Sequence, residues 1–186
     1  MIVGDNCYIS KNAVIGNNVV VGNNVIIRDN VVIEDNVYIG NNNVIGDIPL
    51  FTGLKDPTQG RLYIKNGANI GDFNIIERGC FRDAIIENNS SVSFFCYIGH
   101  DVCIGKECVV FPHCMFCGRV TLEDGVEIGA HVKIFNDVVI GRLSRVFHGA
   151  NVFKSCAEKS FIIGEHGDTL KGWAKKEAFL NKNIRK

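Results

Sequence analysis

The stretch that decides the fold is residues 3–46, VGDNCYISKNAVIGNNVVVGNNVIIRDNVVIEDNVYIGNNNVIG. Every sixth residue from position 3 is aliphatic and β-branched, and asparagine recurs three residues after each of the first seven. A period of six fits neither an α-helix nor an alternating strand. It is typical of a short strand followed by a turn in which asparagine or glycine adopts a left-handed conformation. The repeated aliphatic positions are Val3, Ile9, Ile15, Val21, Ile27, Ile33, Ile39 and Ile45.

The same period returns after residue 63 and continues almost to the end of the chain. It resumes at Ile64, is offset by four residues near 82–85, and then runs unbroken from Ile86 to Val152. Three units close one triangular coil, and successive coils stack about 4.8 Å apart, as strands do in a sheet. The repeat therefore predicts an all-β parallel β-helix of about seven to eight coils. The first and fifth residues of each unit are expected to point inward.

Composition limits the class of protein. The chain has 186 residues, enough for one domain with a short appendage, and is 46% hydrophobic and 22% charged, which indicates a globular protein. Twenty basic and twenty acidic residues balance, which argues against a nucleic-acid surface. No apolar run approaches the roughly 18 residues of a membrane span, and no secretory signal is visible at the N-terminus. We therefore predict a cytoplasmic protein with reduced thiols and no membrane span.

The eight cysteines look at first like a disulfide or redox signal. Cys114 and Cys117 have CxxC spacing, but the repeat assigns Cys114 to the core, so neither a redox nor a zinc role is predicted. Most of the cysteines share the fifth position of a unit, where a small apolar side chain fits. These are Cys7, Cys80, Cys96, Cys108, Cys114 and Cys156.

Two segments interrupt the repeat. Residues 46–63 contain Pro49 and Pro57 and predict a loop that protrudes from one corner, a kind of segment that often carries function. Residues 165–186 predict a short C-terminal helix with Asp168 as its N-cap. The domain prediction is therefore a β-helix over 1–164 and a helical cap over 165–186. The cap has three more basic than acidic residues, and covering the last coil is favoured over docking an anion.

One histidine stands beside a carboxylate at a corner of the predicted prism. His100 is the third residue of its unit and Asp101 follows it, while Gly118 and Asn136 occupy the same corner in the next two coils. A histidine oriented by a carboxylate is a candidate general base. A glycine amide beside it is a candidate oxyanion donor. The alternative interpretation is a solvent-facing turn histidine.

Three further histidines, His113, His131 and His148, fall on another corner in successive coils. Such a stack resembles the γ-class carbonic anhydrases and suggests a metal-dependent hydratase as an alternative. Two of the three are fourth residues of their units and the other is a third, so their side chains are not expected to converge. No metal is predicted.

Three segments between Ile45 and Gly164 carry a family resemblance. They are 45–55, which opens the loop, 70–77 (IGDFNIIE) and above all 97–105 (YIGHDVCIG). With the six-residue repeat, these segments resemble the hexapeptide-repeat acyltransferases. Within that superfamily the chain is most similar to the UDP-N-acetylglucosamine acyltransferases of lipid A synthesis.

The resemblance implies a left-handed β-helix that forms a homotrimer, with three active sites between subunits. It implies His100 as general base, Asp101 as its orienting partner and the Gly118 amide as oxyanion donor. Tyr97 and Arg119 stand where that family has further histidines, and His148 replaces a glycine that often lines the acyl groove, which implies a shorter groove. The substrate-cleft residues implied in this way are Lys55, Tyr97, Arg119, Asn136 and His148.

The function implied is transfer of an acyl group from acyl carrier protein or coenzyme A to a hydroxyl or amine of a nucleotide-activated sugar. The donor is a co-substrate, and no cofactor is bound permanently. One alternative is an acetyl-CoA-dependent N-acetyltransferase acting on a nucleotide amino sugar. A second is a non-catalytic β-helix that serves as a binding module. The sequence leaves open the sugar, the acyl length, the donor carrier and the choice between O- and N-acylation.

Overall fold

The computed structural model describes residues 1–49, 60–164 and 168–169. Its strands form three sheets. The first sheet contains β1 (Ile2–Val3), β4 (Val20–Val21), β7 (Tyr38–Ile39), β10 (Asn69–Ile70), β13 (Ser91–Val92), β16 (Val109–Val110), β19 (Glu127–Ile128), β22 (Arg145–Val146), β24 (Phe161–Ile163) and β25 (Asp168–Thr169). The second contains β2 (Tyr8–Ile9), β5 (Ile26–Ile27), β8 (Val44–Asp47), β11 (Ile75–Glu77), β14 (Tyr97–Ile98), β17 (Met115–Phe116), β20 (Lys133–Ile134) and β23 (Asn151–Val152). The third contains β3 (Val14–Ile15), β6 (Val31–Ile33), β9 (Leu62–Ile64), β12 (Ala84–Ile86), β15 (Cys103–Ile104), β18 (Thr121–Leu122) and β21 (Val139–Ile140).

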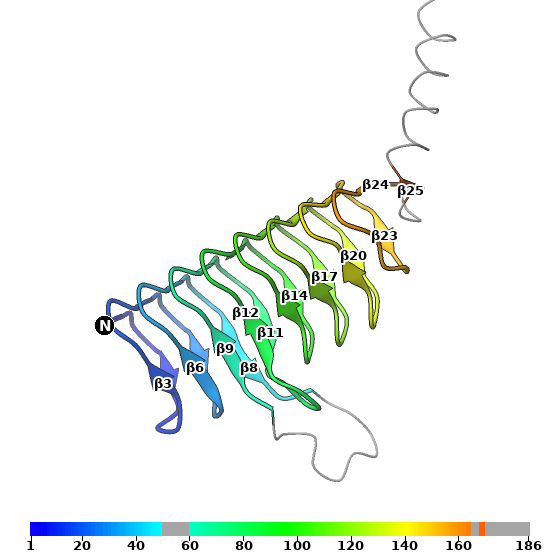
Figure 1. Ribbon diagram of the computed structural model, residues 1–186. Helices are drawn as coiled ribbons and strands as arrows, with labels where there is room; N and C mark the ends of the chain where they lie inside the picture. Colours follow the sequence, from blue (N-terminus) through cyan, green and yellow to red (C-terminus); the bar gives the residue numbers. More distant parts are fainter. Residues whose placement is uncertain (50–59, 165–167, 170–186) are drawn as a thin grey trace, which may run out of the picture.

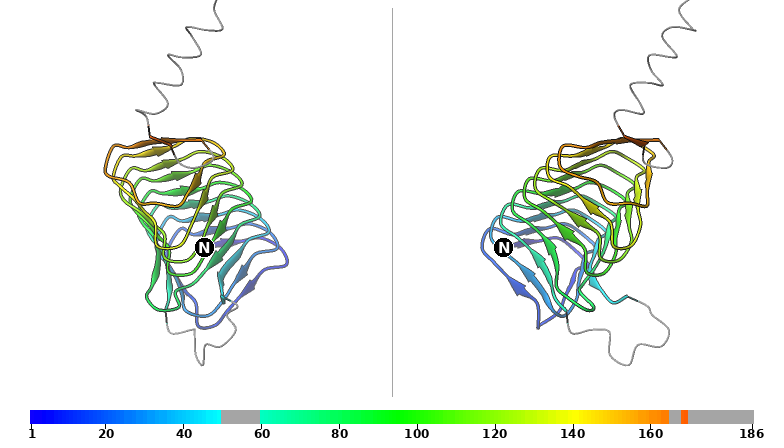
Figure 2. Two further views of the ribbon diagram at one scale, coloured as in Figure 1. Left: turned by 90° about the vertical axis from the view of Figure 1, so that its right-hand side faces the viewer. Right: turned by 45° about the vertical axis from the view of Figure 1, so that its right-hand side comes forward.

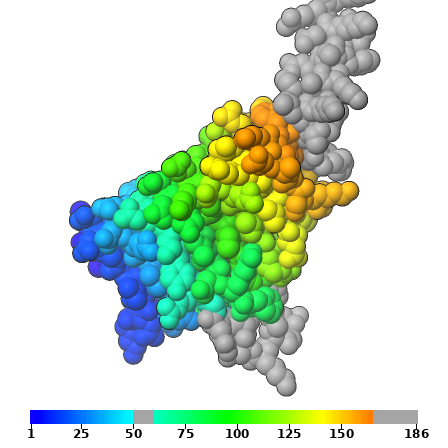
Figure 3. Space-filling view, viewed as in Figure 1, coloured from blue at the N-terminus to red at the C-terminus, as the bar shows by residue number. Residues whose placement is uncertain are grey.

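Each of the first seven coils contributes one strand to each sheet, and equivalent strands of neighbouring coils pair in parallel. Phe116, for example, pairs with Ile134, its counterpart one coil later. The coils stack into a prism, roughly triangular in cross-section (Figures 1 and 2), and appear as successive bands of colour in the space-filling view (Figure 3). The exception is β25, which pairs antiparallel with β24. The predicted left-handed parallel β-helix is confirmed, with one coil for each of the 8 strands of the second sheet.

Corner residues adopt the left-handed backbone conformation that the repeat predicts. Asn18, Asn24, Asn36 and Asn42 all have φ between 54° and 58°. Side-chain hydrogen bonds join them in pairs across the coils, as from Asn24 Nδ2 to Asn42 Oδ1 at 3.2 Å. From Phe73 onwards, residues other than asparagine adopt the same φ, which the asparagine pattern did not predict. They include Phe73, Phe95, Asp101, His113 and His131.

The core is filled by the first and fifth residues of the units, as predicted. Phe116 is the largest fully buried side chain, and all eight cysteines are free thiols. Burial raises the pKa of Cys108 to about 11, so this thiol stays protonated at neutral pH. The fifth-position cysteines Cys80, Cys96, Cys108 and Cys114 are buried, and Cys7 and Cys156 are partly buried.

Two coils are longer than the rest, and both insertions fall at the corner between the second and third sheets. Ile45 pairs with Ile76, 31 positions later, and Ile76 pairs with Ile98, 22 positions later. The first insertion falls between β8 and β9, where the sequence predicts a loop over 46–63, and residues 50–59 of that loop lie outside the described residues. The second lies between β11 and β12 and is four residues longer than a regular corner.

Much of the predicted C-terminal cap lies outside the described residues. Asp168, expected to begin a helix, lies in β25, and the predicted helix beyond it falls in 170–186. Across the part of the chain that the structure describes, no helix has the length and apolar character needed to cross a membrane.

Candidate active site

His100 lies at the corner that follows β14, between the second and third sheets. Only 7% of the residue is exposed, so the interpretation as a solvent-facing turn histidine is wrong. Backbone hydrogen bonds stack the corner on the next two coils, from Arg119 N to the His100 carbonyl at 2.9 Å and from Asp137 N to the Gly118 carbonyl at 3.3 Å. His100, Gly118 and the exposed Asn136 therefore lie above one another, as the repeat predicts.

Asp101 holds the imidazole from one side. Its Oδ2 lies 2.7 Å from His100 Nδ1, and the carboxylate is completely buried. An ionised carboxylate accepts hydrogen bonds only, so the contact assigns the proton to Nδ1 and leaves the lone pair on Nε2. His100 thus presents Nε2 as the basic atom of the site.

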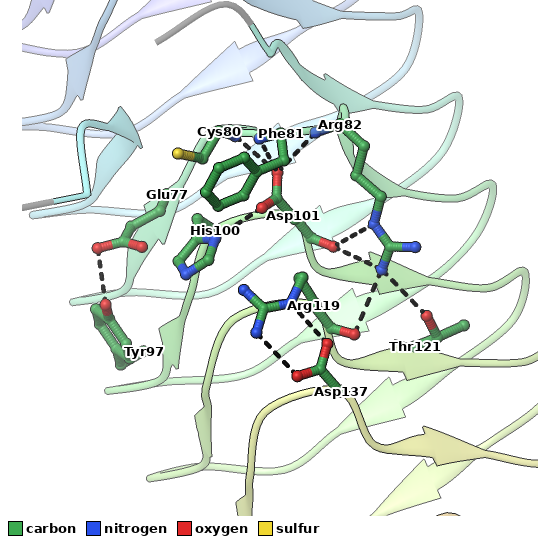
Figure 4. A network of polar contacts seen from close by, with 10 residues as sticks. All are labelled: Glu77, Cys80, Phe81, Arg82, Tyr97, His100, Asp101, Arg119, Thr121 and Asp137. Atoms are coloured by element: carbon green, nitrogen blue, oxygen red, sulfur yellow. Dashed lines mark hydrogen bonds and ion pairs between the residues drawn. The ribbon is translucent and has the colours of Figure 1, made fainter. Parts of the chain in front are cut away.

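The four-residue insertion explains how a buried carboxylate stays charged at this corner. The backbone amides of Cys80, Phe81 and Arg82 all donate to Asp101 Oδ1, at 2.7, 3.0 and 3.1 Å (Figure 4). Burial raises the pKa of Asp101, but the hydrogen bonds from these amides and from His100 outweigh it, and the net pKa is lowered. Asp101 is therefore ionised at neutral pH, with its orientation fixed by three backbone donors.

Arg82 joins the insertion to the next two coils through hydrogen bonds of its guanidinium group. Its Nε and Nη2 donate to the Asp101 carbonyl at 3.1 and 3.0 Å. Its Nη2 also reaches the Arg119 carbonyl at 3.3 Å and Thr121 Oγ1 at 3.4 Å (Figure 4). One guanidinium thus connects three successive coils behind the histidine and fixes the corner that carries it.

Gly118 lies directly against the imidazole. A Cβ added to it would overlap Nε2 and Cε1 of His100, so this position has no room for a side chain. The flanking amides of Cys117 and Arg119 donate to carbonyls of neighbouring coils. Within the described ranges no hydrogen bond from the Gly118 amide is found. The site therefore combines a basic nitrogen with an adjacent backbone amide.

Replacing Gly118 with alanine should lower turnover about 10- to 100-fold, because the new methyl group displaces the imidazole by a large fraction of an ångström or more. Steady-state kinetics on the purified variant measure this effect. Gly105→Ala is the matched control, since its Cβ meets the Glu123–Asp124 backbone at 2.7 to 2.8 Å on another corner. Equal activity losses in the two variants would show that backbone strain, and not the position of His100, is responsible.

Two predicted cleft residues lie beside the histidine with partners that the sequence did not reveal. Tyr97 donates from its hydroxyl to Glu77 Oε1 at 2.7 Å. Arg119 makes a two-pronged ion pair with Asp137, at 2.6 and 2.8 Å. The ion pair raises the pKa of Arg119 and lowers that of Asp137, so both side chains remain charged.

The remaining predicted residues lie elsewhere. His148 is on the corner between the first and second sheets, where its Nδ1 accepts a hydrogen bond from the Ala130 amide at 2.9 Å. There it lines a pocket of about 260 Å³ with the aromatic residues Phe111, Phe147 and Phe161. Its role in an acyl groove stays a prediction, and Lys55 lies outside the described residues.

The other two histidines of that corner stack instead of converging. The rings of His113 and His131 are 4.8 Å apart and nearly parallel, and His113 stacks on Phe95 in the same way. His148 instead contacts Phe111 and Phe147 edge-on. In residues 1–49 and 60–164, no three histidine, cysteine or acidic side chains gather as metal ligands would.

Sequence reasoning missed Glu77 and the amides of residues 80–82. Glu77 is only 7% exposed. Burial raises its pKa, against the opposing effects of the Tyr97 hydroxyl and of His100. The four-residue offset in the repeat was the available signal, since an insertion at the corner next to a candidate base marks a departure from the scaffold.

Comparisons with known proteins agree with this fold. Residues 1–35 and 12–47 match the bacterial transferase hexapeptide (six repeats) family. The UDP-N-acetylglucosamine acyltransferase from Campylobacter jejuni has a TM-score of 0.81 to this chain at 21% identity, and the match covers 100% of this chain and 81% of that one. At this identity the structural likeness shows the fold alone.

The relatives found by sequence are named as N-acyltransferases of UDP-3-O-acylglucosamine. The UDP-3-O-acylglucosamine N-acyltransferase of Caulobacter sp. (strain K31) is 30% identical over 132 residues, which are 70% of this chain and 39% of that protein. A probable UDP-3-O-acylglucosamine N-acyltransferase 2, mitochondrial, of Arabidopsis thaliana is 33% identical over 115 residues, 62% of this chain and 36% of that protein. The chain thus spans less than two fifths of the length of these curated relatives.

Proposed function

We propose that this chain, which belongs to the hexapeptide-repeat superfamily, is an acyltransferase that acylates a hydroxyl or amine of a nucleotide-activated sugar. The observation that carries the proposal is the buried imidazole of His100, held by Asp101 and facing the Gly118 amide. A base next to an amide donor is the arrangement that acyl transfer requires. The names of the sequence relatives support a sugar nucleotide as the acceptor.

The proposed reaction needs no covalent intermediate on the protein. Nε2 of His100 takes the proton of the acceptor O–H or N–H as that atom attacks the thioester carbonyl. The carbonyl oxygen becomes negatively charged and accepts a hydrogen bond from the Gly118 amide. When the C–S bond breaks, the imidazolium returns the proton to the thiolate, so the products are an acylated sugar and a free thiol. Asp101 stabilises the imidazolium while it exists.

The co-substrates and the assembly belong to the same proposal. The donor is an acyl group carried by acyl carrier protein or coenzyme A, and no cofactor is retained between turnovers. The active unit is a homotrimer with the sites between subunits. Asn136, one coil above Gly118, contributes a polar group to the cleft, Lys55 contacts the sugar nucleotide, and His148 ends the acyl groove.

Acceptor-dependent thiol release tests the proposal. Two donors are supplied, acetyl-CoA and an acyl carrier protein loaded with a long acyl chain. Each donor is incubated without an acceptor, with UDP-N-acetylglucosamine, and with the analogue of this sugar nucleotide that has an amino group in place of the 3-hydroxyl. We expect thiol release that requires an acceptor and one class of donor. Absence of acceptor-dependent thiol release with all combinations would contradict the proposal and favour a non-catalytic binding module.

A further inference from the structure

A small pocket lies on the edge of the prism that carries His100, on the N-terminal side of that residue. It has a volume of about 100 Å³. Tyr8 begins β2, and the other lining residues follow β5, β8 and β11, so all of them belong to the four coils before the coil of His100. The lining consists of Tyr8, Arg28, Asp29, Ile48 and Arg78.

Arg78 brings a buried positive charge to this pocket. Only 5% of the residue is exposed. Its Nη1 donates to the Asp29 carbonyl at 3.1 Å, whereas its Nε is buried and has no hydrogen-bond partner among the described residues. Across the same residues, no carboxylate lies within ion-pair distance of its guanidinium. A buried charge destabilises a fold unless it is paired, so Arg78 favours an anion supplied from outside the chain.

The neighbouring carboxylates have partners of their own. Arg28 Nε forms an ion pair with Asp47 Oδ1 at 2.8 Å, and the Arg28 side chain is 43% exposed. Asp29 Oδ1 accepts a hydrogen bond from Ser10 Oγ. The pocket lining therefore has two guanidinium groups and one phenol hydroxyl against one carboxylate. Guanidinium groups bind phosphate oxygens through paired N–H donors, so the lining suits a phosphoryl group.

The pocket is also placed for the acceptor of the proposed reaction. The strands β5, β8, β11 and β14 are consecutive neighbours in the second sheet. Arg78 therefore lies one coil from His100 and Arg28 three coils from it, which is about 14 Å at the spacing of strands in a sheet. In a nucleotide-activated sugar the diphosphate is bonded to the anomeric carbon, away from the group that is acylated. A sugar that reacts at His100 can thus direct its diphosphate towards the arginines.

We propose that this pocket binds the diphosphate of the nucleotide-activated sugar, with Arg28 and Arg78 as donors to the phosphate oxygens. The inference rests on the proposed function and locates the nucleotide end of its acceptor. The diphosphate does not react, so these contacts stabilise the bound substrate and the transition state equally. They should therefore act on KM and not on kcat.

Calorimetric titration with UDP tests the pocket without any turnover. We expect Arg28→Gln and Arg78→Gln each to raise the Kd of UDP about 10-fold, the effect of one lost hydrogen bond to a charged group. Asp47→Asn should leave this Kd unchanged or lower it, because it releases Arg28 from its ion pair. The control is Lys65→Gln, which breaks an ion pair with Glu34 of 2.7 Å beside the third sheet and should not change the Kd.

Two further ligands distinguish the diphosphate of a nucleotide from a free anion. Uridine, which lacks phosphates, should bind at least about 10-fold more weakly than UDP. Inorganic pyrophosphate should compete with UDP, because both place phosphoryl groups in the same pocket. Pyrophosphate that bound without displacing UDP would overturn the assignment to the nucleotide.

Steady-state kinetics with UDP-N-acetylglucosamine link the pocket to the reaction. Arg28→Gln should raise the KM for this sugar nucleotide about 10-fold and keep kcat within about 2-fold. Since the Arg28 side chain is half exposed, this variant keeps the test decisive even if Arg78→Gln fails to fold.

Three outcomes would overturn the inference and leave the proposed function standing. They are a wild-type protein that binds neither UDP nor pyrophosphate, unchanged Kd and KM values in folded arginine variants, and equal weakening of UDP binding by Arg28→Gln and Asp47→Asn. Failure of acyl transfer with every donor and acceptor, while UDP binding still depends on the arginines, would remove the proposed function and keep the phosphoryl site.

Discussion

Replacing His100 with alanine is expected to lower kcat by about 10³-fold, the typical contribution of a positioned general base. The residue is 7% exposed and its Nδ1 is bound to Asp101, so the substitution removes the imidazole that this carboxylate orients. The effect should appear in kcat more than in KM for the donor, because the imidazole acts on the proton of the attacking group.

The matched control for this substitution is His131→Ala. His131 is an exposed corner histidine of the same scaffold, and its ring stacks on His113 away from the corner of His100. It should keep wild-type turnover within about 2-fold. If His100→Ala, with its circular dichroism spectrum and oligomeric state unchanged, turned over at the wild-type rate, His100 would not be the base.

Replacing Asp101 with asparagine should lower kcat by about 10²- to 10³-fold. The three amides of residues 80–82 all donate to Oδ1, so they orient the asparagine oxygen towards themselves. The side-chain NH₂ then faces His100 Nδ1 and forces the ring proton onto Nε2, the wrong tautomer for a base. Asparagine also tolerates the φ of 59° at this corner, so the fold is kept.

The same substitution should change how stability depends on pH. The pKa of Asp101 is lowered in the folded protein, so its stabilising contribution is present above the unfolded pKa and is lost as pH falls through the folded one. Asp101→Asn should therefore weaken the loss of stability on acidification. Denaturant unfolding at a series of pH values checks this. Wild-type turnover in Asp101→Asn would contradict the assigned tautomer.

The scaffold was predictable because a single rule of the sequence repeats in every coil. A branched residue such as Ile104 or Ile128 at each sixth position specifies a strand of fixed length and direction. Both of these residues are 0% exposed because the coils stack on one another. The preference for asparagine at the corners is not a strict rule, because other residues can also adopt the left-handed conformation there. Phe95 and His113 adopt the left-handed conformation of the corner asparagines, since stacking with rings in neighbouring coils accompanies the unfavourable φ.

The candidate site was only partly predictable. The repeat brings His100 and Gly118 to one corner, because residues 18 positions apart in this part of the chain stack in neighbouring coils. The partners of Asp101 and Tyr97 come from the four-residue insertion and its flank. An insertion breaks the register that makes the rest of the chain predictable, so the conformation of residues 77–83 does not follow from the repeat. For His148 the repeat predicts the corner but not the role. This histidine lies on the corner between the first and second sheets, away from the corner of His100.

The measurement that tests the central claim most directly is mass spectrometry of the nucleotide sugar after incubation with the wild-type protein and an acyl thioester. The proposed function predicts that the sugar gains one acyl group for each thiol released. Both signals should fall about 10³-fold with His100→Ala. Thiol release without an acylated sugar, or acylated sugar formed at the same rate by His100→Ala, would contradict it.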